Sequence, residues 1–86
     1  MRVGGIHRAV DTATGDVFKG RILDLYFAQN SIMFVGRNMA DGQYGFVEIK
    51  ENARVVLKYA SCDAAQHMMD VLILRDRMNK RSAYRR

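Results

Sequence analysis

The chain has 86 residues, a length that fits one domain, and its only cysteine, Cys62, excludes a disulfide within the chain. Its unbroken apolar runs, such as residues 71–74, are far too short to cross a membrane, and residues 1–5 lack the apolar run of a signal peptide. We therefore expect a cytoplasmic protein with no membrane segment. In that reducing compartment we interpret Cys62 as a small buried apolar residue rather than a reactive thiol.

The net charge of +5 is concentrated at one end of the chain. Residues 1–74 carry eight basic and eight acidic residues, whereas residues 75–86 carry six basic residues and a single acidic residue, Asp76. Charge gathered in this way favours a polyanionic partner. Cations also suit the C-terminal end of a helix, where the partial charge is negative. The sequence leaves both interpretations open.

Turn-forming residues at short, regular intervals predict a meander of hairpins over residues 1–60. The expected strands are residues 5–11, 16–27, 32–35, 44–49 and 53–59. In the second strand the apolar side chains change face between Ile22 and Leu23, which requires a bulge or bend, and Gly20 would let another backbone approach closely there. In the last strand, residues 53, 55, 57 and 59 are expected to face inward, and Arg54 and Lys58 outward.

A single helix is predicted over residues 61–84, with Ser61 as its N-cap and Asp63 favourable in its first turn. The expected fold is therefore mainly β with one C-terminal helix (α+β). It is a small, bent, five-stranded antiparallel barrel or meander, capped by the helix in one domain, residues 1–86.

The middle of this helix is apolar on most sides, which is more than one sheet can cover. We therefore expect a homo-oligomer, most simply a two-fold dimer. The residues predicted at the oligomer interface are Met68, Met69, Val71 and Leu72.

No motif for catalysis or metal binding stands out. His7 and His67 are far apart in the sequence, and Cys62 and His67 are five residues apart, which does not place them on one helical face. No second pair of ligands could complete a zinc site. We expect a protein that is not an enzyme and that uses no metal or cofactor.

Nucleic-acid binding has more support, because single-strand binders combine basic residues with aromatic and amide side chains at loops. Tyr26 and Phe27 lead into a turn at residues 29–31, and Lys50 and Asn52 flank the turn near residue 51. A bent barrel could bring these two turns together, although we interpret Phe27 as a core residue. The candidate nucleic-acid-binding residues are Tyr26, Asn30, Lys50, Asn52, Arg75, Arg77, Lys80 and Arg81.

Residues 15–59 resemble the Sm-like family, the LSm and Hfq type of small β-barrel. Gly20, Ile22 and Asn30 match its first motif, and the segment from Ile49 to Asn52, which leads into a last strand, matches its second. Tyr26 and Glu51 replace an aspartate and a glycine of the family pattern, and the helix follows the barrel instead of preceding it. The resemblance implies a bent five-stranded barrel, and an RNA site in which Asn30 contacts a base and Lys50 its phosphate.

These observations predict a non-catalytic small-barrel module that self-associates and binds RNA or single-stranded DNA. The alternative is a protein-interaction module, such as a small accessory or inhibitory protein of a mobile element, in which the Met-rich helix is the interface and the basic tail steers association.

Overall fold

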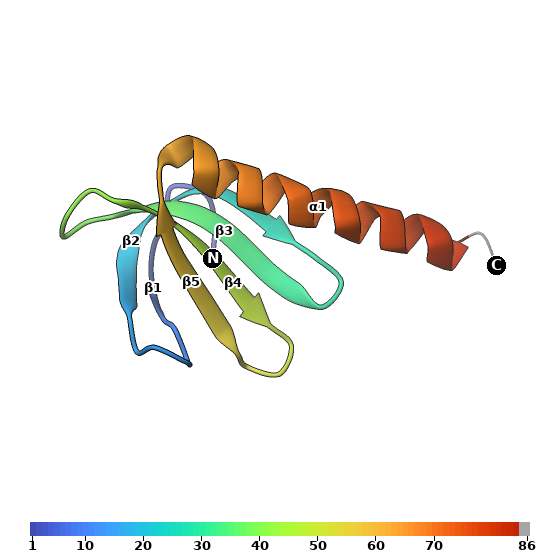
Figure 1. Ribbon diagram of the computed structural model, residues 1–86, viewed down its shortest axis with the longest axis horizontal. Coiled ribbons are helices and arrows are strands. Elements are labelled where there is room, and N and C mark those ends of the chain that lie inside the picture. The colour runs from blue at the N-terminus through green and yellow to red at the C-terminus, as the bar shows by residue number, and fades with distance from the viewer. Residues whose placement is uncertain (85–86) are drawn as a thin grey trace.

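The computed structural model describes the backbone of residues 1–84 and the side chains of residues 1–80. Five antiparallel strands pair in chain order and curl into a half-barrel, and one helix crosses a face of the sheet (Figure 1). The elements are β1 (Ile6–Val10), β2 (Val17–Phe27), β3 (Ser31–Asn38), β4 (Tyr44–Lys50), β5 (Val55–Ala60) and α1 (Cys62–Tyr84). The predicted fold, mainly β with a C-terminal helix, is confirmed.

The sharp bend of β2 has the two causes that the sequence predicts. The pairing register between β2 and β3 shifts between Ile22 and Asp24, so Leu23 is the extra residue of a bulge. At Gly20 the backbone of β3 comes so close that a Cβ would collide with the carbonyl group of Arg37. The bulge turns the second half of β2, and the glycine allows the contact that results.

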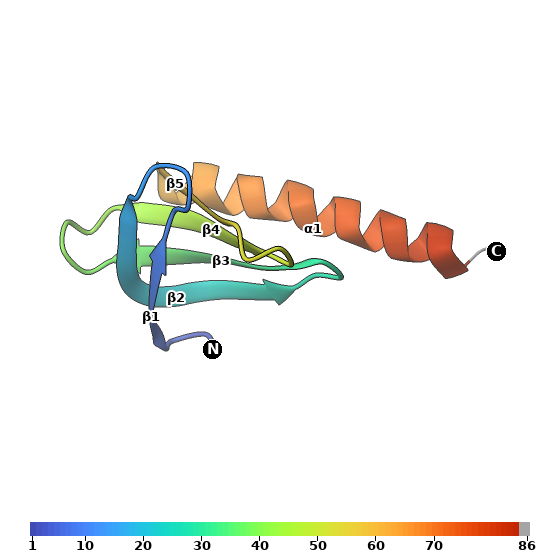
Figure 2. The ribbon, with the colours of Figure 1, turned by 90° about the horizontal axis from the view of Figure 1, so that it is seen from below.

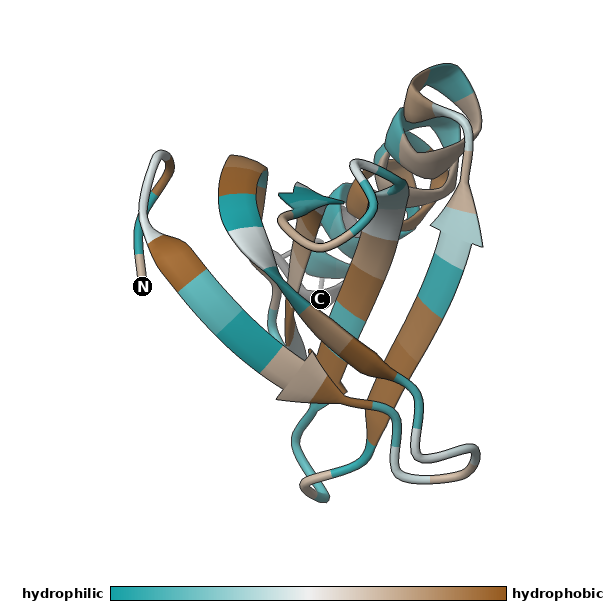
Figure 3. Cartoon of the chain, turned by 90° about the vertical axis from the view of Figure 1, so that its left-hand side faces the viewer, coloured by the Kyte–Doolittle hydropathy of each residue, from teal (hydrophilic) through white to brown (hydrophobic). Residues whose placement is uncertain are grey.

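Two apolar clusters lie on opposite faces of the sheet. The inner cluster fills the curve of the half-barrel and contains Ala9, Phe18, Ile22, Phe34, Val47 and Leu57. The outer cluster lies beneath the helix and contains Met33, Val35, Phe46, Ala65 and Met69. Strands β3 and β4 contribute to both clusters, so apolar residues follow one another along them instead of alternating with polar ones (Figure 3).

The two outer strands of the sheet are joined through the turn that follows β1. The backbone N–H of Thr12 donates to the carbonyl of Val55 at 3.0 Å, and the N–H of Leu57 donates to the carboxylate of Asp11 at 3.0 Å. Asp11 also accepts from the N–H groups of Ala13 and Thr14. The buried Asp11 side chain therefore connects the β1–β2 turn to the free edge of β5.

Helix α1 begins where the sequence predicts. The Ser61 hydroxyl accepts from the N–H of Ala64 at 3.2 Å, the geometry of an N-cap, and Asp63 lies in the first turn. The helix packs on β3, β4 and β5 and then runs past the sheet (Figure 2). Among the described residues, no helix is both long and apolar enough to span a membrane.

The predictions for Cys62, Ala53 and Phe27 are wrong. Cys62 is exposed, because it stands in the first turn of α1, before the helix reaches the outer cluster at Ala65. Ala53 does not face inward from a strand; it lies in the β4–β5 turn with a φ of 64°. Phe27 is 58% exposed, because β2 ends there, beyond the inner cluster.

Candidate nucleic-acid interface

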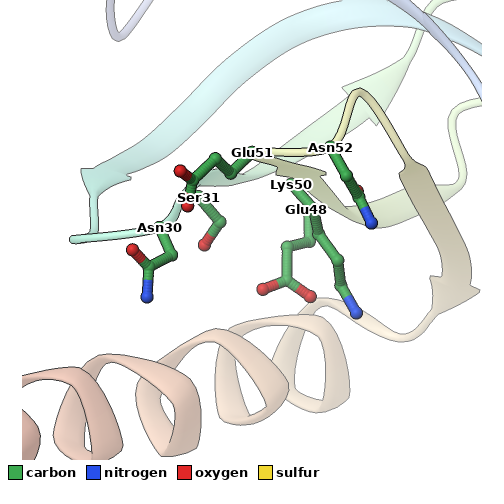
Figure 4. Close-up of a pocket in the computed structure, with 6 residues that line it drawn as sticks. All are labelled: Asn30, Ser31, Glu48, Lys50, Glu51 and Asn52. Atoms are coloured by element: carbon green, nitrogen blue, oxygen red, sulfur yellow. The ribbon is translucent and has the colours of Figure 1, made fainter.

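The β2–β3 and β4–β5 turns meet, as predicted, at one end of the sheet. The backbone N–H of Glu51 donates to the carbonyl of Asn30 at 3.0 Å. An open cleft of about 560 Å³ lies beside this contact, and we name it the tip cleft (Figure 4). It is lined by Asn30, Ser31, Glu48, Lys50, Glu51 and Asn52. Three of the predicted nucleic-acid-binding residues, Asn30, Lys50 and Asn52, therefore lie together.

The tip cleft is rich in amides and mixed in charge. In the amide orientation that satisfies its neighbours, Asn30 Nδ2 donates to the Gln29 carbonyl at 3.2 Å and to Glu51 Oε2 at 3.3 Å. Glu48 and Lys50 extend from β4 toward α1 (Figure 4). Because Glu48 and Glu51 outnumber Lys50, this cleft alone does not attract a polyanion; its amides can contact bases.

A second cavity, also of about 560 Å³, continues from the tip cleft between β5 and α1, and we name it the basic groove. The two cavities share Glu48 and Lys50. The basic groove is lined by Phe46, Glu48, Lys50, Arg54, Val56, Lys58, His67, Met68, Val71 and Leu72. The lining has three cations, Lys50, Arg54 and Lys58, and one carboxylate, that of Glu48. The electrostatic potential of the basic groove is therefore positive.

The predicted cations of α1 have different surroundings. Arg75 is exposed and follows Met68 and Leu72 on one face of the helix, so it extends the basic groove toward the C-terminus. Arg77 is exposed on the opposite flank. Lys80 is half-buried and forms an ion pair with Asp76 at 3.2 Å. The side chain of Arg81 lies outside the described residues.

Tyr26 does not lie in the tip cleft as predicted; it faces α1. Its hydroxyl donates to Asp76 Oδ2 at 2.8 Å, and the backbone N–H of Gln29 donates to Asp76 Oδ1 at 3.0 Å. The hydrogen bond from Gln29, then that from Tyr26 and the neighbouring Lys80, lower the pKa of Asp76, and the Asp76 carboxylate raises the pKa of Lys80. The partner that holds Tyr26 against the helix, Asp76, lies 50 residues later in the chain, so the pattern around Tyr26 does not predict this orientation.

The four residues predicted at the oligomer interface differ in how far they are buried against the sheet. Met69 is fully buried in the outer cluster, so its assignment to an oligomer interface is wrong. Met68 and Leu72 are half-buried against the same cluster and line the basic groove. Val71 is 43% exposed. Three of these four side chains therefore pack, wholly or partly, against the sheet of the same chain.

The sequence predicts that Arg54 and Lys58 face outward from a last strand over residues 53–59 but does not assign them to the site; in the structure Arg54 directly precedes β5. Their spacing of four residues in extended chain keeps them on one face, and Lys50 joins them across the β4–β5 turn, where its backbone N–H donates to the carbonyl of Arg54 at 2.8 Å. The sequence analysis also does not single out Asp11, although the local sequence contains a signal for it. An aspartate whose side chain accepts from the backbone N–H groups two and three residues later, here those of Ala13 and Thr14, is typical of an Asx turn.

The remaining candidates for chemistry are dispersed. His7 packs edge-on against Phe34, with ring centres 5.6 Å apart, in the curve of the half-barrel, whereas His67 lies on α1 beside the basic groove. Within the described part of the chain, no three His, Cys, Asp or Glu side chains are grouped so that they could hold a metal ion.

Comparisons of the chain with protein-family models, with curated proteins and with solved structures find no significant match. The resemblance to the Sm-like family therefore stays a prediction.

Proposed function

We propose that this chain is a non-catalytic small-barrel module that binds a single strand of RNA or DNA along the basic groove, with its bases turned into the tip cleft. The observation that carries the proposal is the row of Lys50, Arg54 and Lys58, which leads directly to the amides of Asn30 and Asn52.

The basic groove suits the phosphates of a nucleic-acid strand, and the tip cleft suits its bases. Lysine and arginine side chains along a groove neutralise phosphates and position the strand without reading its sequence. Amide side chains offer both donors and acceptors, so Asn30 and Asn52 can bind the edges of unstacked bases. The resemblance to the Sm-like family assigns the same roles to Asn30 and Lys50, and it supports the proposal independently of the groove.

The carboxylates of Glu48 and Glu51 favour a weak interaction over a tight one at the tip cleft. They repel phosphate, so the strand must approach the tip through its bases. The proposed module uses no cofactor and acts in the cytoplasm, where the exposed thiol of Cys62 stays reduced.

A salt titration with a fluorescent oligonucleotide of about 12 nucleotides tests the proposal. Changing Lys50, Arg54 and Lys58 together to Ala should flatten the salt slope by about 2, because each phosphate contact on a single strand contributes about 0.7. Asn30→Ala should reduce the preference among bases and leave the slope nearly unchanged.

A matched control removes the same charge from another part of the surface. Arg2, Arg8 and Lys19 are exposed on the N-terminal segment, β1 and β2, and none of them lines either cavity. Changing these three to Ala should leave the salt slope close to that of the wild type. Equal slopes for the two triple variants would show that binding follows net charge alone, and the groove assignment would be wrong.

A polypeptide partner is the second candidate, and the floor of the basic groove favours it. Val56, Met68 and Leu72 present aliphatic surface, and the aromatic ring of Phe46 is almost fully buried, so among the lining residues only the exposed imidazole of His67 offers a base a ring to stack on. An acidic segment with apolar side chains would fit this floor. If the wild-type protein binds no oligonucleotide even at low salt, this candidate replaces the first.

A further inference from the structure

Helix α1 carries a second apolar stripe on the side away from the sheet. Val71, Leu74 and Met78 are 43%, 60% and 58% exposed, and their spacings of three and four residues place them on one face, whose edge at Val71 also borders the basic groove. We name these three residues the outer stripe. The opposite face holds the buried residues Ala65 and Met69. Because the sheet covers only one of these two faces, the outer stripe leaves an apolar surface exposed to solvent, which is typical of an interaction site.

The outer stripe is nearly symmetrical about Leu74. Val71 lies three residues before it and Met78 four residues after it, so two antiparallel copies would bring Val71 of each chain against Met78 of the other. Figures 1 and 2 show this side of the helix open along its length.

The charges beside the outer stripe have the same symmetry. Asp70 lies four residues before Leu74 and Arg77 three residues after it, and because they are seven apart they share one flank of the helix. In a two-fold antiparallel pair, each flank of one helix meets the same flank of the other. Asp70 of each copy would therefore face Arg77 of the other. Gln66 Nε2 donates to Asp70 Oδ1 at 3.0 Å and orients this carboxylate.

We propose that the outer stripe binds a second copy of this chain, as an antiparallel α1–α1 dimer with its two-fold axis beside Leu74. The seam consists of three apolar side chains from each copy, flanked by two reciprocal Asp70–Arg77 ion pairs. The occupant is a second copy because both the apolar spacing and the charge pattern complement themselves.

Among the residues whose side chains are described, Arg75 opposes the pairing. Arg75 lies on the other flank, close to the two-fold axis, so the two Arg75 side chains face each other. Neutralising this charge with Arg75→Gln should tighten the dimer by roughly twofold, the scale of a single like-charge pair on a helix surface. The same flank borders the basic groove, so both grooves open on one side of the dimer.

Sedimentation equilibrium over a hundredfold range of concentration, up to roughly 500 μM, tests the dimer. The wild type should move from 9.8 kDa toward twice that mass. Leu74→Asp should weaken the dimer by about 100-fold or more, because the pairing would bury a charge. Met39→Asp is the matched control: Met39 is 63% exposed on the β3–β4 turn, so this change should leave the association unchanged.

Charge reversal distinguishes a second copy from any other partner. Asp70→Arg and Arg77→Asp should each weaken the dimer, because each places like charges together, and the double variant should restore it. A double variant weaker than both single variants would overturn the assignment of these pairs. A wild type that stays at 9.8 kDa throughout would overturn the dimer itself.

Cross-linking tests the antiparallel direction in a Cys62→Ser background. Under oxidation, a mixture of the single variants Val71→Cys and Met78→Cys should form a disulfide between unlike chains. Disulfides that form only between like chains would show parallel helices and overturn the proposal. The cross-linking and the sedimentation experiments need no nucleic acid. They can therefore disprove the dimer without bearing on the proposed nucleic-acid binding, and the salt titration can disprove that binding without bearing on the dimer.

Discussion

The backbone N–H of Leu57 donates to Asp11 Oδ2 at 3.0 Å, and the two residues are 46 positions apart in the chain. This hydrogen bond joins the β1–β2 turn to the outer edge of β5. Ala13 and Thr14 donate to the other carboxylate oxygen at 2.8 and 3.0 Å. One side chain therefore organises its own turn and closes one end of the half-barrel, and the pKa of Asp11 is lowered by the same hydrogen bonds, that of Leu57 first.

Asp11→Asn should lower the melting temperature, because the amide keeps one acceptor oxygen and must leave either the turn or Leu57 unpaired. In hydrogen exchange, the amide of Leu57 should lose protection more than the amides of β3. Asp16→Asn, an exposed change in the same turn, is the control and should have little effect. An unchanged amide at Leu57 would show that Asp11 does not hold the edge of β5.

Stability should fall in acid, in a window set by Asp11 and Asp76. Both carboxyl groups have a pKa in the folded chain below the ordinary value of 3.8. The unfolded chain therefore takes up protons first, and acid shifts the equilibrium toward it. The contribution of these two carboxylates to the free energy of unfolding should be complete above about pH 5 and should be lost as the pH falls through their lowered pKa values. Melting temperatures from pH 7 to pH 2 would check this, and Asp11→Asn should flatten the curve.

Gly20→Ala should destabilise the chain by about 2 kcal/mol or more, because the new methyl group would collide with the carbonyl of Arg37 and β2 would have to move from β3. Urea unfolding measures the change in the free energy of unfolding. Gly5→Ala is the control: its new contacts are to Arg2, close to the N-terminus, which can move aside. If Gly20→Ala lowers the free energy of unfolding no more than Gly5→Ala does, the close approach of β3 to Gly20 would be contradicted.

Ala53 has a φ of 64°, a conformation that costs a residue with a side chain about 1 kcal/mol. Ala53→Gly should therefore raise the free energy of unfolding by roughly 0.5 kcal/mol, after allowing for the greater freedom of glycine in the unfolded chain. Ala53→Val should lower it, since branched side chains tolerate this region poorly. Ala40→Gly, in an exposed turn without a positive φ, should be slightly destabilising instead.

Tyr26→Phe should loosen the turn of α1 that follows Asp76. The change removes one donor from Asp76, which also accepts from the N–H of Gln29 and pairs with Lys80. Amide exchange from Arg77 to Lys80 should become several-fold faster, while exchange at Ala65 and Met69 stays as in the wild type. Uniform acceleration along α1 would instead show that Tyr26 acts through the whole helix–sheet contact.

The sequence predicts those features of the fold that depend on neighbouring residues. Turn residues and the change of apolar face in β2 predict five strands and a bulge, because both follow from the period-two alternation of a strand. Ser61 predicts the start of α1 for an equally local reason. The meeting of Asn30 with the β4–β5 turn was also predictable, since adjacent antiparallel hairpins bring their tips together.

The errors come from relationships between distant residues. The residues around Tyr26 predict a place at a loop, and only the position of Asp76, 50 residues later, shows that Tyr26 faces the helix. Met69 and Val71 are both apolar on one helix, and the sheet decides which is buried. The basic groove exists because α1 lies beside β5, a placement that the pattern of either element alone does not specify.

The outer cluster has a consequence during synthesis, because α1 follows the sheet in the chain. Strands β3 and β4 are made first, and the outer faces of Met33, Val35 and Phe46 have no cover until the helix arrives. At about 5–20 residues per second, the 23 residues of α1 take about 1–5 s to synthesise. Until the helix docks, a sheet formed by these strands presents an uncovered apolar face. It is then most prone to associate with another nascent chain, and a chaperone has most apolar surface to bind.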